Sequence, residues 1–231
     1  ILPGMFCLIY GFAFITALEE EYQQSTQKKQ VKKSGFSPNW KLALAAVFLS
    51  TASGGVVFSA MTFVVPRYFE ISMVSISSSV AITGLLASLV YACASFTQIA
   101  VGWIIDRVEP KWVLFGIGIG QIFFIFLTSQ FTDYALFFAM LIAMSFVFGQ
   151  IPITDTLLSR YVPDEWRAKA LSLKFMLNLV VGAAALPICG LLLQSGMMMS
   201  SLFVILSCIA VLVVASGIIL PVQIASHRQD L

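Results

Sequence analysis

The chain has 231 residues, of which 59% are hydrophobic and only 10% are charged, and its formal net charge is +2. Soluble globular domains carry about 25% charged residues, so this composition excludes an ordinary soluble protein and indicates an integral membrane protein. The small net charge gives no reason to expect a nucleic-acid partner.

The apolar residues fall in long runs. A membrane-spanning helix needs about 20 mostly apolar residues, and these runs are continuously apolar, whereas the strands of a membrane barrel alternate. The sequence therefore predicts an all-α integral membrane protein. In chain order, the predicted spans are 1–18, 42–66, 77–105, 112–130, 134–158, 169–194 and 199–221.

Basic residues are distributed unevenly along the chain. Segment 19–41 is a polar linker with a lysine cluster. Alternate connecting segments hold 12 of the 13 Lys and Arg residues, counted with the tail 222–231 and with Lys169 and Lys174 in the first turns of the span 169–194. Cytoplasmic loops of membrane proteins are enriched in Lys and Arg. We therefore expect residue 1 to lie outside, the linker and the tail to lie in the cytoplasm, and the protein to lie in the plasma (inner) membrane.

An acid and a base stand side by side at the end of the third predicted span, as Asp106 and Arg107, with Gly102 four residues before them. The pair could be an ordinary helix-end anchor, because charged side chains near the end of a span extend to the interface. Asp-Arg-Val in this place also resembles the third helix of a seven-helix, rhodopsin-like receptor. The last predicted span, however, lacks the Asn-Pro-x-x-Tyr pattern of that family.

A third interpretation is a resemblance to the major facilitator superfamily of transporters. One short cytoplasmic loop of that family reads approximately G-x-L-x-D-R-x-G-R-K. Its glycine, acid, first base and final lysine are matched by Gly102, Asp106, Arg107 and Lys111. Three other positions depart from the pattern, namely Ile104, Glu109 and Pro110.

Two further stretches resemble landmarks of the same family. The stretch SRYVPDEWRAKALSLK, 159–174, resembles the loop between the tenth and eleventh helices, and SGGVVFSAMTFVVPRYFE, 53–70, resembles the seventh helix. The three stretches occur in the family's order. The resemblance implies that 1–18 is the sixth helix of a twelve-helix carrier, and that 42–221 is its C-terminal six-helix bundle, helices seven to twelve.

The resemblance also implies a function. The protein would be a secondary active transporter that moves a small solute by alternating access, together with an N-terminal half, and a coupling proton is left open. Asp106 would cap a helix of the other half, and Arg107 would hold an acid of its own half, Asp155 or Glu165. The expected conformational gate comprises Gly102, Asp106, Arg107, Lys111, Asp155, Arg160 and Arg167.

Polar residues recur on one face of several predicted spans, and the family's helix order would turn these faces towards a central cavity. Such faces are also usual at membrane helix contacts that bind no ligand. Lys174 lies about 9 Å along its predicted helix, so we expect it to reach the cytoplasmic surface; if it faced the cavity, it would attract an anionic substrate. The expected solute path comprises Thr51, Gly55, Ser59, Thr62, Tyr91, Gln98, Gln150, Lys174 and Asn178.

Other chemistry has little support in the sequence. The spans 112–130 and 199–221 carry few polar residues and are expected to face lipid. Asp155 is the only acid deep enough to be considered for protonation, and a structural role is favoured for it. The sequence offers no metal-ligand spacing, no phosphate-binding loop and no nucleophilic triad, so we expect no enzymatic activity, no cofactor and no metal.

Overall fold

The computed structural model describes residues 39–73 and 79–221, and all of these belong to one compact unit, Phe36–Leu231. Every helix of this part is long and apolar enough to cross a membrane. The prediction of an all-α membrane protein is therefore confirmed. The predicted span 1–18, most of the linker 19–41 and the tail 222–231 lie outside the described residues. The helices are α2 (Trp40–Ser72), α3 (Val80–Ile105), α4 (Pro110–Thr128), α5 (Asp133–Tyr161), α6 (Asp164–Gln194) and α7 (Met199–Ile219).

Of the helices that extend beyond their predicted spans, α2 and α6 do so by the most residues. α2 begins at Trp40, inside the predicted linker, and continues through Pro66 to Ser72. Proline is tolerated within membrane helices because neighbouring groups satisfy the freed backbone. α6 begins at Asp164, directly after Pro163. Its first turn holds two acids, which suit the positive end of the helix dipole.

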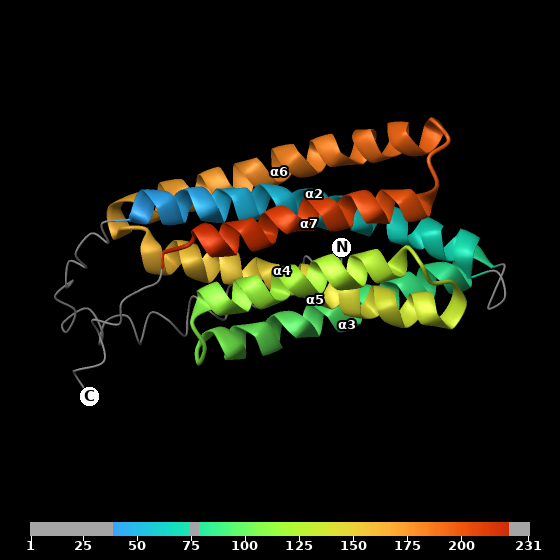
Figure 1. The fold of residues 1–231 in the computed structure, drawn as a ribbon, viewed down its shortest axis with the longest axis horizontal. Helices are drawn as coiled ribbons and strands as arrows, with labels where there is room; N and C mark the ends of the chain where they lie inside the picture. Colours follow the sequence, from blue (N-terminus) through green and yellow to red (C-terminus); the bar gives the residue numbers. More distant parts are fainter. Residues whose placement is uncertain (1–38, 74–78, 222–231) are drawn as a thin grey trace, which may run out of the picture. The chain divides into compact units, whose positions relative to one another are not determined.

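The helices are arranged around α2 and α5. α2 packs against α5, α6 and α7, while α5 packs against α3 and α4. α3 contacts mainly α5 and α6 contacts mainly α2, so these two helices lie along opposite edges of the unit (Figure 1). α4 and α7 pack against each other. The two helices expected to face lipid are therefore less exposed within the described unit than α3 and α6.

The starts of α2, α4 and α6 and the ends of α3, α5 and α7 meet at one end of the unit, which we call the basic end. The rings of Trp40 and Trp166 stack there, with their centroids 6.3 Å apart. The Lys111 ammonium donates to the backbone carbonyl of Leu220 at 2.7 Å, which ties α4 to the end of α7. Among the described residues, Arg67 is the only basic residue at the opposite end.

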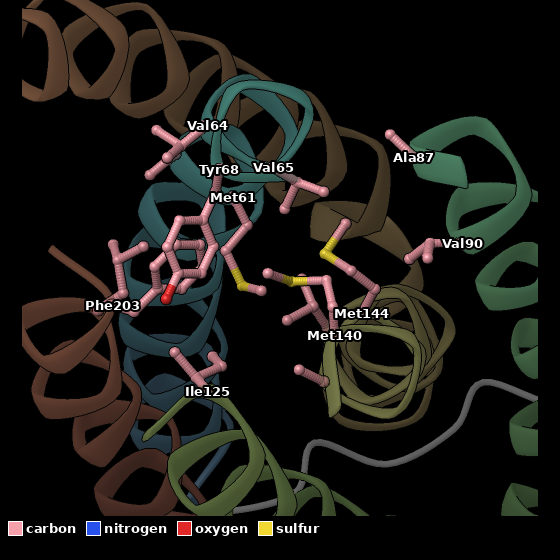
Figure 2. Packing of buried hydrophobic residues seen from close by; sticks show 14 of the residues in the cluster. Met61, Val64, Val65, Tyr68, Ala87, Val90, Ile125, Met140, Met144 and Phe203 are labelled. Atoms are coloured by element: carbon pink, nitrogen blue, oxygen red, sulfur yellow. The ribbon is translucent and has the colours of Figure 1, made fainter. Parts of the chain in front are cut away.

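The largest apolar cluster lies towards that opposite end. Met61, Met140 and Met144 are fully buried there, and the ring centroids of Tyr68 and Phe203 lie 4.8 Å apart (Figure 2). The Tyr68 hydroxyl donates to the carbonyl of Thr128 at 3.0 Å. Buried apolar side chains and a paired hydroxyl therefore hold this end of the unit together.

Candidate functional site

A pocket of about 110 Å³ lies between α2, α5 and α6, and we call it the α2–α5–α6 pocket. Its apolar walls include Phe58, Val147 and Phe175. Most of its polar lining was expected from the sequence. The expected residues that line it are Thr51, Gly55, Gln150, Asp155, Lys174 and Asn178.

Lys174 and Asp155 form an ion pair across the pocket. The Lys174 ammonium donates to Asp155 Oδ1, and the Lys174 side chain is 7% exposed while that of Asp155 is 43% exposed. A buried ammonium without a partner would be strongly unfavourable, so Asp155 is what makes this position possible. Of the two side chains, that of Asp155 is the one more accessible to solvent in the described unit.

This pair corrects the expectation that Lys174 reaches the cytoplasmic surface. Because α6 begins at Asp164, Lys174 lies about 15 Å along the helix and not about 9 Å. At that depth its chain is buried against α2 and α5, and its charge is matched inside the unit. Lys174 lines the α2–α5–α6 pocket instead; the alternative interpretation, in which it faces a central cavity, stays a prediction.

A chain of hydrogen bonds crosses the unit beside the pocket. Gln150 Nε2 donates to the carbonyl and to the hydroxyl of Ser50, at 2.8 and 2.9 Å. Gln150 Oε1 accepts from Gln121 Nε2 at 2.8 Å. All three residues are buried, so the Gln150 amide links α2, α5 and α4.

The two partners of Gln150 were not anticipated. Ser50 was overlooked beside its neighbour Thr51, and Gln121 was set aside because α4 was expected to face lipid. A glutamine is costly in lipid, so its presence in an otherwise apolar span was a signal that it faces another helix.

Thr51 differs from Gln150 in its hydrogen bonding. Thr51 is 6% exposed and lines the pocket. Its hydroxyl oxygen Oγ1 is buried and has no hydrogen-bond partner among residues 39–73 and 79–221. Buried polar atoms are nearly always paired, so an unsatisfied hydroxyl at the wall of the pocket is unusual.

α2 and α6 approach each other closely beside the pocket. A Cβ atom added to Gly55 would lie 2.8 Å from Asn178 Oδ1, and one added to Gly182 would lie 2.7 Å from Ser59 Oγ. Only glycine therefore allows this approach without a shift of the neighbouring side chain. Ser59 belongs to this helix contact and does not line the pocket.

Three other residues of the expected solute path also lie outside the pocket. The Tyr91 hydroxyl donates to the carbonyl of Thr62 at 3.0 Å, which joins α3 to α2. Gln98, on α3, is partly exposed. The pocket is thus formed by the faces of α2, α5 and α6, and α3 takes no part in its lining.

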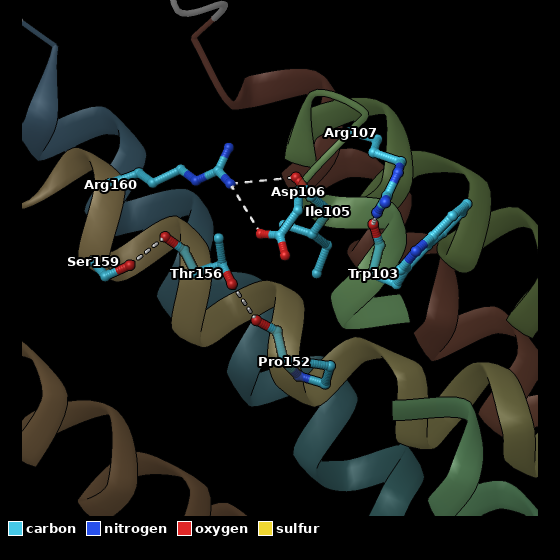
Figure 3. Close-up of polar contacts among 8 residues, drawn as sticks. All are labelled: Trp103, Ile105, Asp106, Arg107, Pro152, Thr156, Ser159 and Arg160. Carbon is cyan, nitrogen blue, oxygen red and sulfur yellow. Dashed lines mark hydrogen bonds and ion pairs between the residues drawn. The ribbon is translucent and has the colours of Figure 1, made fainter. Parts of the chain in front are cut away.

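The basic end carries the Asp-Arg pair. Arg160 Nη2, on α5, lies 4.0 Å from Asp106 Oδ1 and donates to the carbonyl of Ile105 at 3.3 Å (Figure 3). The Asp106 side chain is 78% exposed. No other described group lies within 4 Å of a Cβ atom built on Gly102. The face of α3 that carries Gly102 is thus open within the described unit.

Arg107 does not pair with Asp155 or Glu165 in this structure. Its guanidinium stacks on the ring of Trp103, with Cζ 3.7 Å from the ring centroid, and donates to the Trp103 carbonyl at 3.0 Å (Figure 3). The reason is position, since Arg107 lies past the end of α3 whereas Asp155 lies inside α5 and is paired with Lys174.

Arg167 also has a local partner. Its Nη2 atom lies 2.7 Å from Asp164 Oδ1, one turn earlier on α6, while its Nε atom is buried without a partner among the described residues. Asp155 lies in the pocket and pairs with Lys174. The other residues of the expected gate share the basic end, but they do not form one continuous network.

In a comparison with known protein families, the family model described as Major Facilitator Superfamily matches residues 70–229. The match includes both the Asp106 loop and the stretch from Arg160 to Lys174. No curated protein matches the chain.

Proposed function

Because the chain belongs to the Major Facilitator Superfamily, a family of membrane transporters, we propose that it is a secondary active transporter of a small solute that works by alternating access. The single observation that carries the proposal is the α2–α5–α6 pocket. There a half-buried ion pair and a hydroxyl without a partner among the described residues lie within helices long and apolar enough to span a membrane. Ionisable residues inside membrane helices typically mark a transport pathway. The family match does not favour a seven-helix receptor.

The chain supplies the C-terminal half of this transporter in our proposal. The pattern matches around Gly102, 159–174 and 53–70 support helices seven to twelve, and α2 to α7 take those places. Within the described unit, the apolar faces of α3 and α6 are the least buried. We propose that an N-terminal half covers part of these faces and closes the solute cavity.

The gate in this proposal lies at the basic end. The exposed Asp106 carboxylate and the open Gly102 face allow a helix N-terminus of the other half to approach, where its dipole favours a negative charge. The Arg160 guanidinium, on α5, lies 4.0 Å from the Asp106 carboxylate. Lys111 fixes the end of α7. Contacts of this kind can form in one state and separate in the other, as when packed units rotate against each other.

The solute path in this proposal follows the pocket. Thr51, Lys174 and Asn178 are the groups offered to a solute, while Gly55 and Gln150 position the helices that carry them. Ser59, Thr62, Tyr91 and Gln98 lie outside the pocket and would contribute on the remainder of the path.

We propose that the protein lies in the plasma membrane, with the basic end on the cytoplasmic side and residue 1 on the outer side. This orientation is supported by the concentration of the described Lys and Arg residues at that end, with Arg67 at the other.

The proposal is tested with the full-length carrier in proteoliposomes. The vesicles are loaded with a mixture of small anionic, neutral and cationic solutes, and exchange with the same solutes, isotopically labelled, is followed by mass spectrometry. An alternating-access carrier should exchange at least one solute saturably. The rate should fall in Thr51→Val but not in Thr128→Val, because Thr128 is buried outside the pocket. Failure of every solute to exchange, with correctly inserted protein, would contradict the proposal.

A further inference from the structure

The ion pair in the α2–α5–α6 pocket points to the class of solute. We propose that the pocket binds a small organic carboxylate on the Lys174 ammonium, and that Asp155 takes up one proton when the carboxylate replaces it as the partner of Lys174. This inference rests on the proposed transport function and names its substrate class.

The charges around the pocket are few. Lys174 and Asp155 are the only charged residues that line it, and no other titratable side chain of the described α2, α3, α4, α5 or α6 faces it. The next charged residue along α5 is Arg160, which is held at Asp106 and Ile105. On α6 the nearest is Lys169, whose ammonium lies over the Trp166 ring, 4.9 Å from its centroid. A bound anion therefore has one available cation.

The remaining lining favours a carboxylate joined to an apolar group. The buried Thr51 hydroxyl, unpartnered among the described residues, can donate to a carboxylate oxygen. Asn178 lies four residues after Lys174 and so on the same face of α6, where its amide offers two further donors. The rest of the wall includes Phe58, Val147 and Phe175, which suit an apolar body. A sugar-like solute would leave such walls unmatched.

The charge balance explains why a proton must accompany the anion. In the structure the pocket holds one ammonium and one carboxylate, so its net charge is zero. An anion added to that pair would place two carboxylates beside one ammonium, and like charges this close favour protonation of one of them. If Asp155 accepts a proton, the ammonium keeps one anionic partner and the net charge stays zero. No covalent bond other than the new O–H bond of Asp155 forms or breaks.

The experiment is titration calorimetry on the purified full-length carrier near neutral pH. The probes are butyrate and benzoate, with benzamide and benzylamine as the neutral and cationic counterparts of benzoate. Each titration is repeated in two buffers of different ionisation enthalpy, which reports the protons taken up on binding. We expect binding of at least one carboxylate with uptake of about one proton per anion, and no binding of the amide or the amine.

Three variants separate the roles of the pair. Lys174→Met should weaken carboxylate binding by about 30-fold or more. Asp155→Asn should still bind the carboxylate but without proton uptake, and this loss of proton linkage is a result that a merely structural role of Asp155 would not give. The matched control Lys169→Met, on the exposed face of the same helix, should behave as the wild type.

Two outcomes would overturn the inference. One is carboxylate binding by the wild type without proton uptake; this measurement needs no variant to fold. The other is no carboxylate binding at all. If the carrier then still exchanges neutral or cationic solutes in proteoliposomes, only the inference fails, whereas loss of all exchange removes the proposed transport function as well.

Discussion

Replacement of Asp155 by Asn should destabilise the carrier more than replacement of its partner Lys174 by Met. Asp155→Asn leaves a buried ammonium without a negative partner, because the Lys174 side chain is only 7% exposed. Lys174→Met removes the buried charge itself and leaves the Asp155 carboxylate, which is 43% exposed and can be hydrated. The loss of Asp155 is therefore expected to lower the stability of the folded carrier more than the loss of Lys174.

The magnitude follows from this difference in exposure. Breaking a fully buried ion pair costs about 3–5 kcal/mol. Water can reach the pair from the Asp155 side, so we reduce the expected cost of Asp155→Asn to about 1–2 kcal/mol. One kcal/mol shifts the midpoint of a unit of 150–250 residues by about 2–4 °C, so the expected decrease is about 2–8 °C. Lys174→Met should cost less than about 1 kcal/mol.

The assay is the thermal unfolding midpoint of the purified full-length carrier in detergent, measured for both single variants and for the double variant. The double variant should be close to Lys174→Met, because the unpaired ammonium is then absent. Glu70→Gln serves as the control. Glu70 forms an ion pair with Arg67 one turn earlier on α2, and both side chains are partly exposed, so this substitution should change the midpoint little. Single effects that add within about 0.5 kcal/mol would refute the reasoning.

Three further predictions concern the gate, the helix packing and the orientation. Asp106→Asn should slow transport severalfold with an almost unchanged midpoint, as its side chain is 78% exposed; unchanged turnover in a proteoliposome assay would instead leave it as a helix-end anchor. Gly54→Ala should destabilise by about 1–3 kcal/mol, because the new methyl group would overlap a buried glutamine of α5, whereas Gly84→Ala has open space and should be nearly neutral in the same unfolding assay. A cysteine at Lys111 should react with an impermeant thiol reagent only from the cytoplasm and one at Glu70 only from outside, and the reverse pattern in intact cells would invert the proposed orientation.

The helices could be predicted from the sequence because each membrane span needs its own run of about 20 apolar residues, which is a property of one local stretch of the chain. Long apolar runs fix where helices lie, and the polar faces of α2 and α5 identified Thr51 and Gln150 as part of the interior. The stacking of Arg107 on Trp103 was within reach of the same reasoning, since residues four apart share a helix face.

The partners of the polar residues depend on contacts between helices. The Gln150 amide reaches Ser50 and Gln121, which are 100 and 29 residues away in the chain. No periodicity within one span indicates such partners. The pairing of Lys174 with Asp155 depends in addition on where α6 begins, because a later start would place the lysine nearer the membrane surface. The gate stays a prediction, because the helix that Asp106 is expected to cap would belong to the proposed N-terminal half.

The central claim, that the α2–α5–α6 pocket opens alternately to the two sides of the membrane, is tested most directly by chemical labelling. In a full-length carrier from which the native cysteines have been removed, Thr51→Cys places a thiol in the pocket, and Ser207→Cys places one between α7 and α4, where the Ser207 hydroxyl donates to the carbonyl of Ile122. We predict that an impermeant thiol reagent reaches the pocket thiol from either side of oriented vesicles, and that the Ser207→Cys thiol reacts from neither side. Labelling of the pocket thiol from one side only, under every solute and pH condition tested, would contradict the claim.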